Sequence, residues 1–170
     1  MTSHRGDAVS SPAHPVLRPP GVEARPMPWT ADAAFPSAAL RIECSREGLA
    51  RARSFTRETL RAWSLGHRCD DATLVMSELA ANAAIHAAPR SAGAPEVRLG
   101  FHLDPAHLLL TVSDPDDRPP VHTPASALEQ HGRGLGIVDA LCEAWGWTPT
   151  PPAGKTVWAR LSAHATHPPT

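Results

Sequence analysis

The 170-residue sequence is poor in cysteine, in aromatic residues and in net charge. Its three cysteines lie far apart and form no Cys-x-x-Cys pair, which argues against a disulfide scaffold or a zinc site and favours a reducing cytoplasm. The net charge of −1 argues against a nucleic-acid-binding surface, because such surfaces usually carry a clear basic excess. No apolar run approaches the roughly 18 residues of a membrane span. We therefore expect a cytoplasmic protein without direct contact to nucleic acid or membrane.

Proline marks the ends of the expected domain. The chain has 19 prolines, and they are dense before Ser37 in a stretch with little hydrophobic periodicity. Such a segment buries too little apolar area to offset its ordering entropy. We expect a disordered tail over residues 1–36, with Trp29 and Phe35 as anchors if the tail docks. The expected domain covers residues 37–162, and residues 163–170 form a flexible C-terminus.

Hydrophobic periodicity divides this domain into helices and strands. Spacings of three and four residues predict amphipathic helices over 46–65 and 70–87, and glycines open a third helix over 134–145. Alternating or short apolar runs predict strands over 39–44, 97–103, 108–113, 145–147 and 156–161. Residues 114–131 show no period and predict a long loop. The order predicts an α+β two-layer sandwich with a mixed, mostly antiparallel sheet and three helices on one face.

Polar side chains follow one face of the second predicted helix. Glu78, Asn82 and His86 are four residues apart, among Ala, Leu and Ile. A metal or phosphate site supplies the partners that such polar groups need. A carboxylate polarises a hydroxyl or a water, and an amide oxygen ligates Mg²⁺. The same pattern also fits the solvated face of a surface helix, so this box alone leaves both interpretations open.

Two further boxes lie beyond the hairpin. Asp114 ends a predicted strand, where a carboxylate accepts a hydrogen bond from an exocyclic amine such as that of adenine, although Asp-Pro is also ordinary turn chemistry. Gly132-Arg133-Gly134-Leu135-Gly136 precedes a helix. Glycines let backbone amides approach phosphate and a helix N-terminus attracts anions, although the stretch also fits a flexible lead-in.

The stretch Gly154-Lys155-Thr156 suggests a P-loop at first sight. Pro149 stands where that motif needs its first glycine, and a strand follows instead of a helix, so we reject a P-loop. The stretch instead predicts a turn into the last strand, with the Thr156 hydroxyl facing the same pocket as Asp114.

The order of these boxes resembles the GHKL ATPase superfamily, which includes histidine kinases and gyrase. Within it the chain looks most like the small anti-sigma-factor serine/threonine kinases of actinobacterial type, over about residues 37–162. The resemblance implies a Bergerat-type ATP-binding fold. It is carried by Glu78-Leu79-Ala80-Ala81-Asn82-Ala83, by Gly132-Arg133-Gly134-Leu135-Gly136-Ile137-Val138-Asp139-Ala140-Leu141 and by Gly154-Lys155-Thr156-Val157-Trp158.

The resemblance implies ATP and Mg²⁺ as ligands and gives each box a role. Glu78 would be the general base, Asn82 the Mg²⁺ ligand and Asp114 the acceptor of the adenine amino group. Thr156 would support the adenine contact, and residues 119–131 would form the ATP lid. The other implied nucleotide contacts are His86, Gly132, Arg133, Gly134, Leu135 and Gly136.

One departure from the family pattern concerns the stretch that begins at Asp114. The family usually has Asp-x-Gly-x-Gly, whereas this chain has Asp114-Pro115-Asp116-Asp117-Arg118-Pro119 without either glycine. Asp116 and Asp117 bring negative charge close to the expected nucleotide unless they point to solvent or reach a cation, and we rank a role in holding Mg²⁺ below solvent exposure.

The resemblance implies an anti-sigma factor that sequesters a sigma factor. It would also transfer the γ-phosphoryl group of MgATP to a serine of an anti-anti-sigma (STAS-domain) partner. Two alternatives stay open, a nucleotide-gated protein-binding module without useful kinase activity and an interaction domain whose boxes have decayed. A homodimer through the first helix or first strand is a further expectation.

Overall fold

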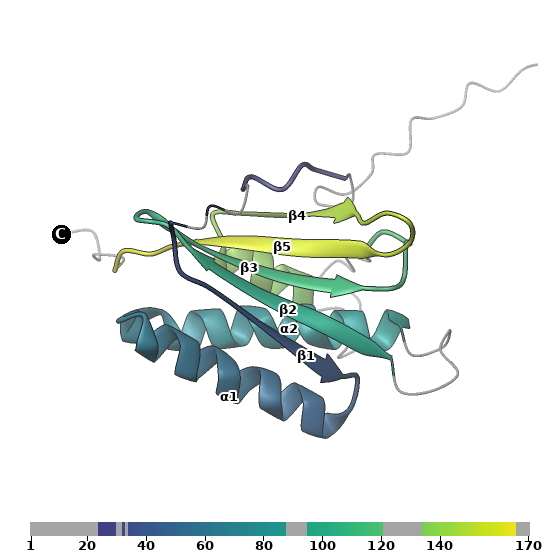
Figure 1. Ribbon diagram of the computed structural model, residues 1–170, viewed down its shortest axis with the longest axis horizontal. Helices are drawn as coiled ribbons and strands as arrows, with labels where there is room; N and C mark the ends of the chain where they lie inside the picture. Colours follow the sequence, from purple (N-terminus) through teal and green to yellow (C-terminus); the bar gives the residue numbers. More distant parts are fainter. Residues whose placement is uncertain (1–23, 30–31, 33, 88–94, 121–133, 166–170) are drawn as a thin grey trace, which may run out of the picture.

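The computed structural model describes residues 24–29, 32, 34–87, 95–120 and 134–165. A five-stranded sheet in the order β1-β2-β3-β5-β4 forms one layer, and each neighbouring pair of strands is antiparallel. Figure 1 shows the helices together on one side of this sheet. The expected α+β sandwich is confirmed. In chain order the elements are β1 (Ser37–Glu43), α1 (Arg46–Ala62), the 3₁₀ turn η1 (Gly66–Arg68), α2 (Cys69–Ala87), β2 (Glu96–Leu103), β3 (His107–Asp114), α3 (Gly134–Leu141), β4 (Ala144–Pro149) and β5 (Lys155–Ser162).

Helix α1 begins and ends through local signals. The Ser45 hydroxyl accepts a hydrogen bond from the Gly48 amide at 3.0 Å and so caps the first turn. Along the helix, Ala52, Thr56 and Leu60 are buried at spacings of four residues and form the face that packs inward. Beyond the last turn, Ser64 adopts a positive φ of 59° and reverses the chain toward α2.

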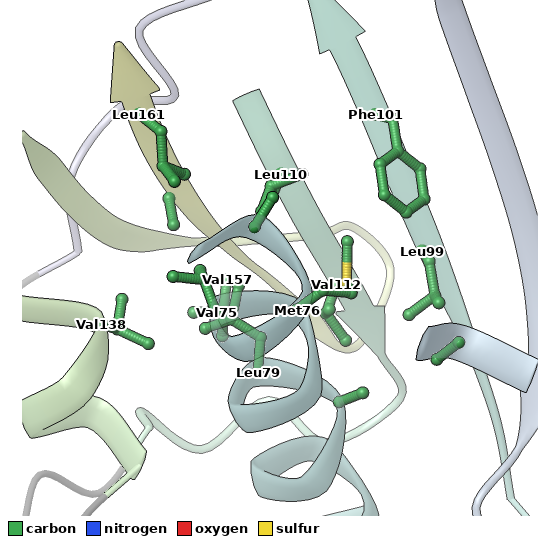
Figure 2. Packing of buried hydrophobic residues seen from close by; sticks show 14 of the residues in the cluster. Val75, Met76, Leu79, Leu99, Phe101, Leu110, Val112, Val138, Val157 and Leu161 are labelled. Carbon is green, nitrogen blue, oxygen red and sulfur yellow. The ribbon is translucent and has the colours of Figure 1, made fainter. Parts of the chain in front are cut away.

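Alternating residues of the strands form the core beneath α2. Figure 2 shows Val75, Met76 and Leu79 of α2 over the apolar side chains of the sheet, with Val138 of α3 beside them. Burying each such side chain contributes about 1.5–3 kcal/mol, so the packing fixes α2 against β3. The sheet residues labelled in that view are Leu99, Phe101, Leu110, Val112, Val157 and Leu161.

The other face of the sheet carries Trp158 and is covered in part by residues near the N-terminus. Gly146 leaves room for the indole, since a Cβ there would lie 2.9 Å from the ring. Arg25 donates its backbone N–H to the Trp147 carbonyl at 2.8 Å and accepts from Trp158 Nε1 at 3.4 Å. The tail expected over residues 1–36 therefore includes Arg25, which contacts the sheet. Residues 1–23 lie outside the described ranges. Of the expected anchors, Phe35 is exposed.

Two of the differences from the predicted boundaries concern the end of α3 and the C-terminal end of the domain. Helix α3 ends at Leu141 instead of continuing to residue 145, because Trp145 already belongs to β4, where it pairs with Ala159 of β5, and is buried. Beyond β5, Ala163 is buried and bonds to the Ala106 carbonyl. Among the described residues, no helix combines the length and the apolar character needed to cross a membrane.

Candidate functional site

The polar face of α2, which carries Glu78, meets the glycine-rich stretch 132–136 at Gly134, where α3 begins. Glu78 lies half-buried on α2, and a Cβ built on Gly134 would lie only 2.6 Å from the Glu78 Oε2 atom. A glycine at the start of α3 therefore lets the helix end approach the carboxylate closely. Burial raises the pKa of Glu78 above its ordinary value, because desolvation disfavours the charged form. A carboxylate with a raised pKa is a better proton acceptor, which suits the predicted base role.

Asn82 lies one helical turn beyond Glu78 on α2 and is half-buried. Within the described residues, no three His, Cys, Asp or Glu side chains form a cluster that could hold a metal. A Mg²⁺ ion here would depend on the Asn82 amide oxygen together with oxygens of a bound ligand, which is how Mg²⁺ commonly binds beside phosphates. His86 belongs to the last turns of α2, but its side chain lies outside what the structure describes.

Asp114 ends β3 as a fully buried carboxylate with unequal oxygens. Its Oδ1 accepts from the Lys155 ammonium at 3.0 Å and from the Asp116 backbone N–H at 2.8 Å. Its Oδ2 is buried and has no hydrogen-bond partner in the described part of the chain. Burial raises the pKa of Asp114, and the hydrogen bond from Lys155 opposes that rise. Asp114, the predicted adenine acceptor, therefore has one oxygen that accepts two hydrogen bonds and one buried oxygen that accepts none from the described residues.

The glycine-free loop after Asp114 is closed by ion pairs. The Asp116 side chain is only 2% exposed, and Arg118 donates to its two oxygens from Nε at 3.0 Å and from Nη2 at 2.8 Å. These bonds from Arg118 hold the pKa of Asp116 low, at about 2. Of the two possibilities that the sequence left open, Asp116 does not point to solvent but reaches a cation, because Arg118 compensates its burial. Asp117 is exposed.

Thr156 faces the side of the sheet opposite the helices. Its hydroxyl lies 2.8 Å from that of Ser113 and 3.1 Å from that of Thr150. Together with Arg98 and His102, Ser113 and Thr156 line a cavity of about 350 Å³ on that face. Burial and the nearby Arg98 lower the pKa of His102. The expectation that Thr156 shares a pocket with Asp114 is thus wrong, since neighbouring residues of β5 alternate between faces.

Lys155, and not Thr156, is the residue of β5 that contacts Asp114. The sequence analysis did not predict this contact. The signal was present in the alternation of β5, where Val157, Ala159 and Leu161 are core residues. Counting back by two from Val157 places residue 155 on the inner face and residue 156 on the outer face. A lysine at an inner position implies a buried carboxylate partner.

The third box is described only in part. Gly134, Leu135 and Gly136 form the first turn of α3, and Leu135 is buried. Gly132 and Arg133 lie outside the described residues, as does most of the expected lid. The structure thus brings Glu78 and Gly134 together, places Asn82 on the same helix as Glu78 and separates Thr156 from Asp114.

Comparison with known proteins matches one family to most of the chain. The family model of the histidine kinase-like ATPase domain matches residues 42–161, which run from β1 into β5. Among curated proteins, no sequence matches the chain. The matched range contains Glu78, Asn82 and Asp114.

Proposed function

Because the chain belongs to the histidine kinase-like ATPase family, we propose that it is an ATP-dependent serine/threonine protein kinase that acts as an anti-sigma factor. The family supports the coarser statement, an ATP-binding regulatory protein. The finer proposal is that the protein sequesters a sigma factor and phosphorylates a serine of an anti-anti-sigma (STAS-domain) partner.

One observation carries this proposal, the contact between Glu78 and the first residue of α3. The Glu78 carboxylate lies directly beside Gly134, with no room for a Cβ between them. The free N–H groups of a helix N-terminus attract phosphate. A carboxylate at the same place is within reach of a hydroxyl that approaches such a phosphate, which is the arrangement that phosphoryl transfer to serine needs.

The residues present fit ATP and Mg²⁺. Asp114 Oδ2 is a buried acceptor without a partner in the described ranges, and the 6-amino group of adenine is a donor. The Asn82 amide oxygen adds a hard, neutral ligand on the same helix as Glu78. When bound, Mg²⁺ would neutralise negative charge on the phosphates of ATP.

The transfer itself exchanges one phosphorus–oxygen bond for another. The serine oxygen forms a bond to the γ-phosphorus while the bond from that phosphorus to the β-γ bridging oxygen breaks, so ADP leaves. Glu78 accepts the proton that the serine hydroxyl loses. The raised pKa of Glu78 favours this acceptance.

A nucleotide-gated binding module is a second candidate, and the loop after Asp114 favours it. In place of two glycines the loop has Asp116 and Arg118, which pair with one another. A loop held closed by this ion pair presents a fixed surface, which suits a protein-binding module. Such a module binds ATP and a partner but transfers no phosphate.

Calorimetric titration of the full chain with ATP, with and without Mg²⁺, tests the nucleotide site. We expect Mg²⁺-dependent binding that Asn82→Ala abolishes and that Ser77→Ala keeps. Ser77 is the matched control, because it lies on the same helix and its hydroxyl bonds only to the Thr73 carbonyl in the described residues. Equal MgATP affinity in Asn82→Ala would remove Asn82 from the magnesium site, and no binding in any variant would favour the decayed interaction domain.

Radiolabel transfer from [γ-³²P]ATP to purified STAS-domain proteins then separates kinase from binding module. We expect label on a serine of one such protein, with Glu78→Gln binding ATP normally but transferring at least about 100-fold more slowly. The acceptor's Ser→Ala variant is the control for the site of labelling. ATP binding without transfer to any STAS protein would support the binding module instead.

A further inference from the structure

Lys155 is the chain's single lysine, and the proposed transfer chemistry does not use it. Its side chain is 1% exposed, next to a carboxylate that is 0% exposed. Burying two charges costs several kcal/mol in desolvation, and replacing such a pair by apolar residues is often neutral or stabilising. The pair therefore calls for an explanation beyond stability.

The contacts of Lys155 distinguish the two oxygens of Asp114. The ammonium donates to Asp114 Oδ1 at 3.0 Å and to the Asp116 carbonyl at 2.9 Å. The Asp116 backbone N–H donates to the same Oδ1 at 2.8 Å. One carboxylate oxygen thus receives two donors, while Oδ2, equally buried, receives none from the described residues.

The backbone around Lys155 brings its side chain to this carboxylate. Gly154 has a φ of 107°, and a Cβ there would run into the Asp114 carbonyl oxygen, so a glycine lets the start of β5 lie against the end of β3. Lys155 is the register partner of Asp114 in the β3–β5 ladder. Thr156, next along β5, points to the other face, so Lys155 is the residue of β5 that reaches Asp114.

An unpartnered buried oxygen is costly, by about 1–3 kcal/mol, unless a ligand supplies the donor. We propose that Lys155 is a positioning residue for base selection, which saturates Asp114 Oδ1 and leaves Oδ2 as a lone acceptor for the 6-amino group of adenine. This inference rests on the proposed ATP-binding function. It adds the residue that makes the site discriminate an amino purine from an oxo purine.

The physical reason lies in the protonation of Asp114. An ionised carboxylate only accepts hydrogen bonds, so it binds an amino group and repels the 6-oxo group of an oxo purine. Burial by itself raises the pKa of Asp114, and Lys155 acts against that rise. Without the ammonium, the buried carboxyl is protonated more readily, and a protonated carboxyl donates to a 6-oxo group. Loss of Lys155 should therefore reduce selectivity more than it reduces binding of all purine nucleotides.

Selectivity is measured by titrating the full-length protein with ATP and with inosine triphosphate, which has a 6-oxo group in place of the amino group. We expect the wild type to prefer ATP by about tenfold or more, and Lys155→Met to bring the two affinities within about threefold of one another. Arg68→Met is the matched control. Arg68 is likewise buried and donates to a carboxylate, that of Asp71, at 3.0 Å, but it precedes α2, whereas Asn82 lies toward the other end of that helix.

The outcomes separate this inference from the proposed function. Wild-type protein that binds neither nucleotide contradicts the proposed function and the inference with it. Wild-type protein that binds both equally keeps the nucleotide site and overturns the inference. Folded Lys155→Met, verified by circular dichroism, with its preference for ATP intact also overturns it, and so does the same loss of preference in Arg68→Met.

A measurement on the wild type keeps the inference testable if Lys155→Met does not fold. With ¹³C-labelled lysine, the single lysine side chain gives one Cε resonance in the NMR spectrum. We expect saturating ATP to shift this resonance clearly and inosine triphosphate at the same saturation to shift it less. A resonance that stays unchanged at full ATP occupancy would show that the base does not meet Asp114.

Discussion

The ion pair between Asp116 and Arg118 makes a quantitative prediction about acid stability. The pKa of Asp116 falls from its ordinary value of 3.8 to about 2 in the folded protein. A shift of this size corresponds to about 2 kcal/mol in favour of the folded state when the carboxyl is ionised. Arg118 is 52% exposed, so solvent screens the pair. We therefore expect Asp116→Asn to lower the free energy of unfolding by about 1–2 kcal/mol at pH 7.

Because folding lowers the pKa of Asp116, the stability that its carboxylate contributes depends on pH in a predictable direction. A carboxyl whose pKa is lowered on folding stabilises the protein above the unfolded pKa, and that contribution disappears as the pH falls through the folded pKa. The difference between wild type and Asp116→Asn should therefore be constant from pH 7 down to about pH 5, roughly halved near pH 3, and nearly absent at pH 2. Urea unfolding followed by circular dichroism at each pH measures it.

Asp117→Asn is the matched control for this experiment. Asp117 is the next residue and carries the same formal charge, but it is exposed. We expect its replacement to change stability by less than about 0.5 kcal/mol at any pH. A difference for Asp116→Asn that stays the same from pH 7 to pH 2 would refute the reasoning, because the lost stability would then not come from an ionised carboxylate.

Three further variants probe other parts of the domain. Gly134→Ala should push the Glu78 carboxylate aside and slow phosphate transfer at least about tenfold while unfolding temperature changes little, and unchanged transfer would deny that contact a catalytic role. Leu79→Ala should cost about 2–5 kcal/mol in urea unfolding, because its side chain is completely enclosed beneath α2. Ser45→Ala should cost about 0.5–2 kcal/mol by the same assay, and no loss would mean that the Gly48 amide finds water instead.

The elements that periodicity defines could be predicted from the sequence. Helix α1 has a buried residue at each fourth position and a serine cap, so both its face and its start are encoded locally. Strand β2 alternates Val97, Leu99 and Phe101 with polar residues or glycine, and its inner face follows from that pattern. Strands β2–β3 and β4–β5 follow one another as hairpins, and a pair of helices lies between β1 and β2, which is consistent with an antiparallel sheet.

Thr156 and Asp116 show where such prediction ends. Thr156 was assigned by its place in a motif, although the alternation of β5 already put its neighbour Lys155 on the inner face. For Asp116 the sequence left both solvent exposure and contact with a cation open, and local pattern does not reveal that Arg118 folds back onto it. Pairs of charged residues two positions apart in a loop depend on backbone turns that hydrophobic periodicity does not describe.

The contact between Arg25 and the sheet has a consequence for where this domain physically begins. The family match starts at residue 42, and composition suggests a start near residue 37. A shortened protein beginning at residue 37 would keep every strand that the structure describes, whereas one beginning at residue 42 would also lose most of β1. Both would lack the Arg25 carbonyl that Trp158 Nε1 bonds to and the Arg25 guanidinium that lies over the Trp158 ring. Such a protein would expose the Trp158 indole on the face of the sheet opposite the helices, and we expect this apolar surface to promote self-association. We therefore expect the folding unit to include Arg25, which precedes the start of the family match at residue 42.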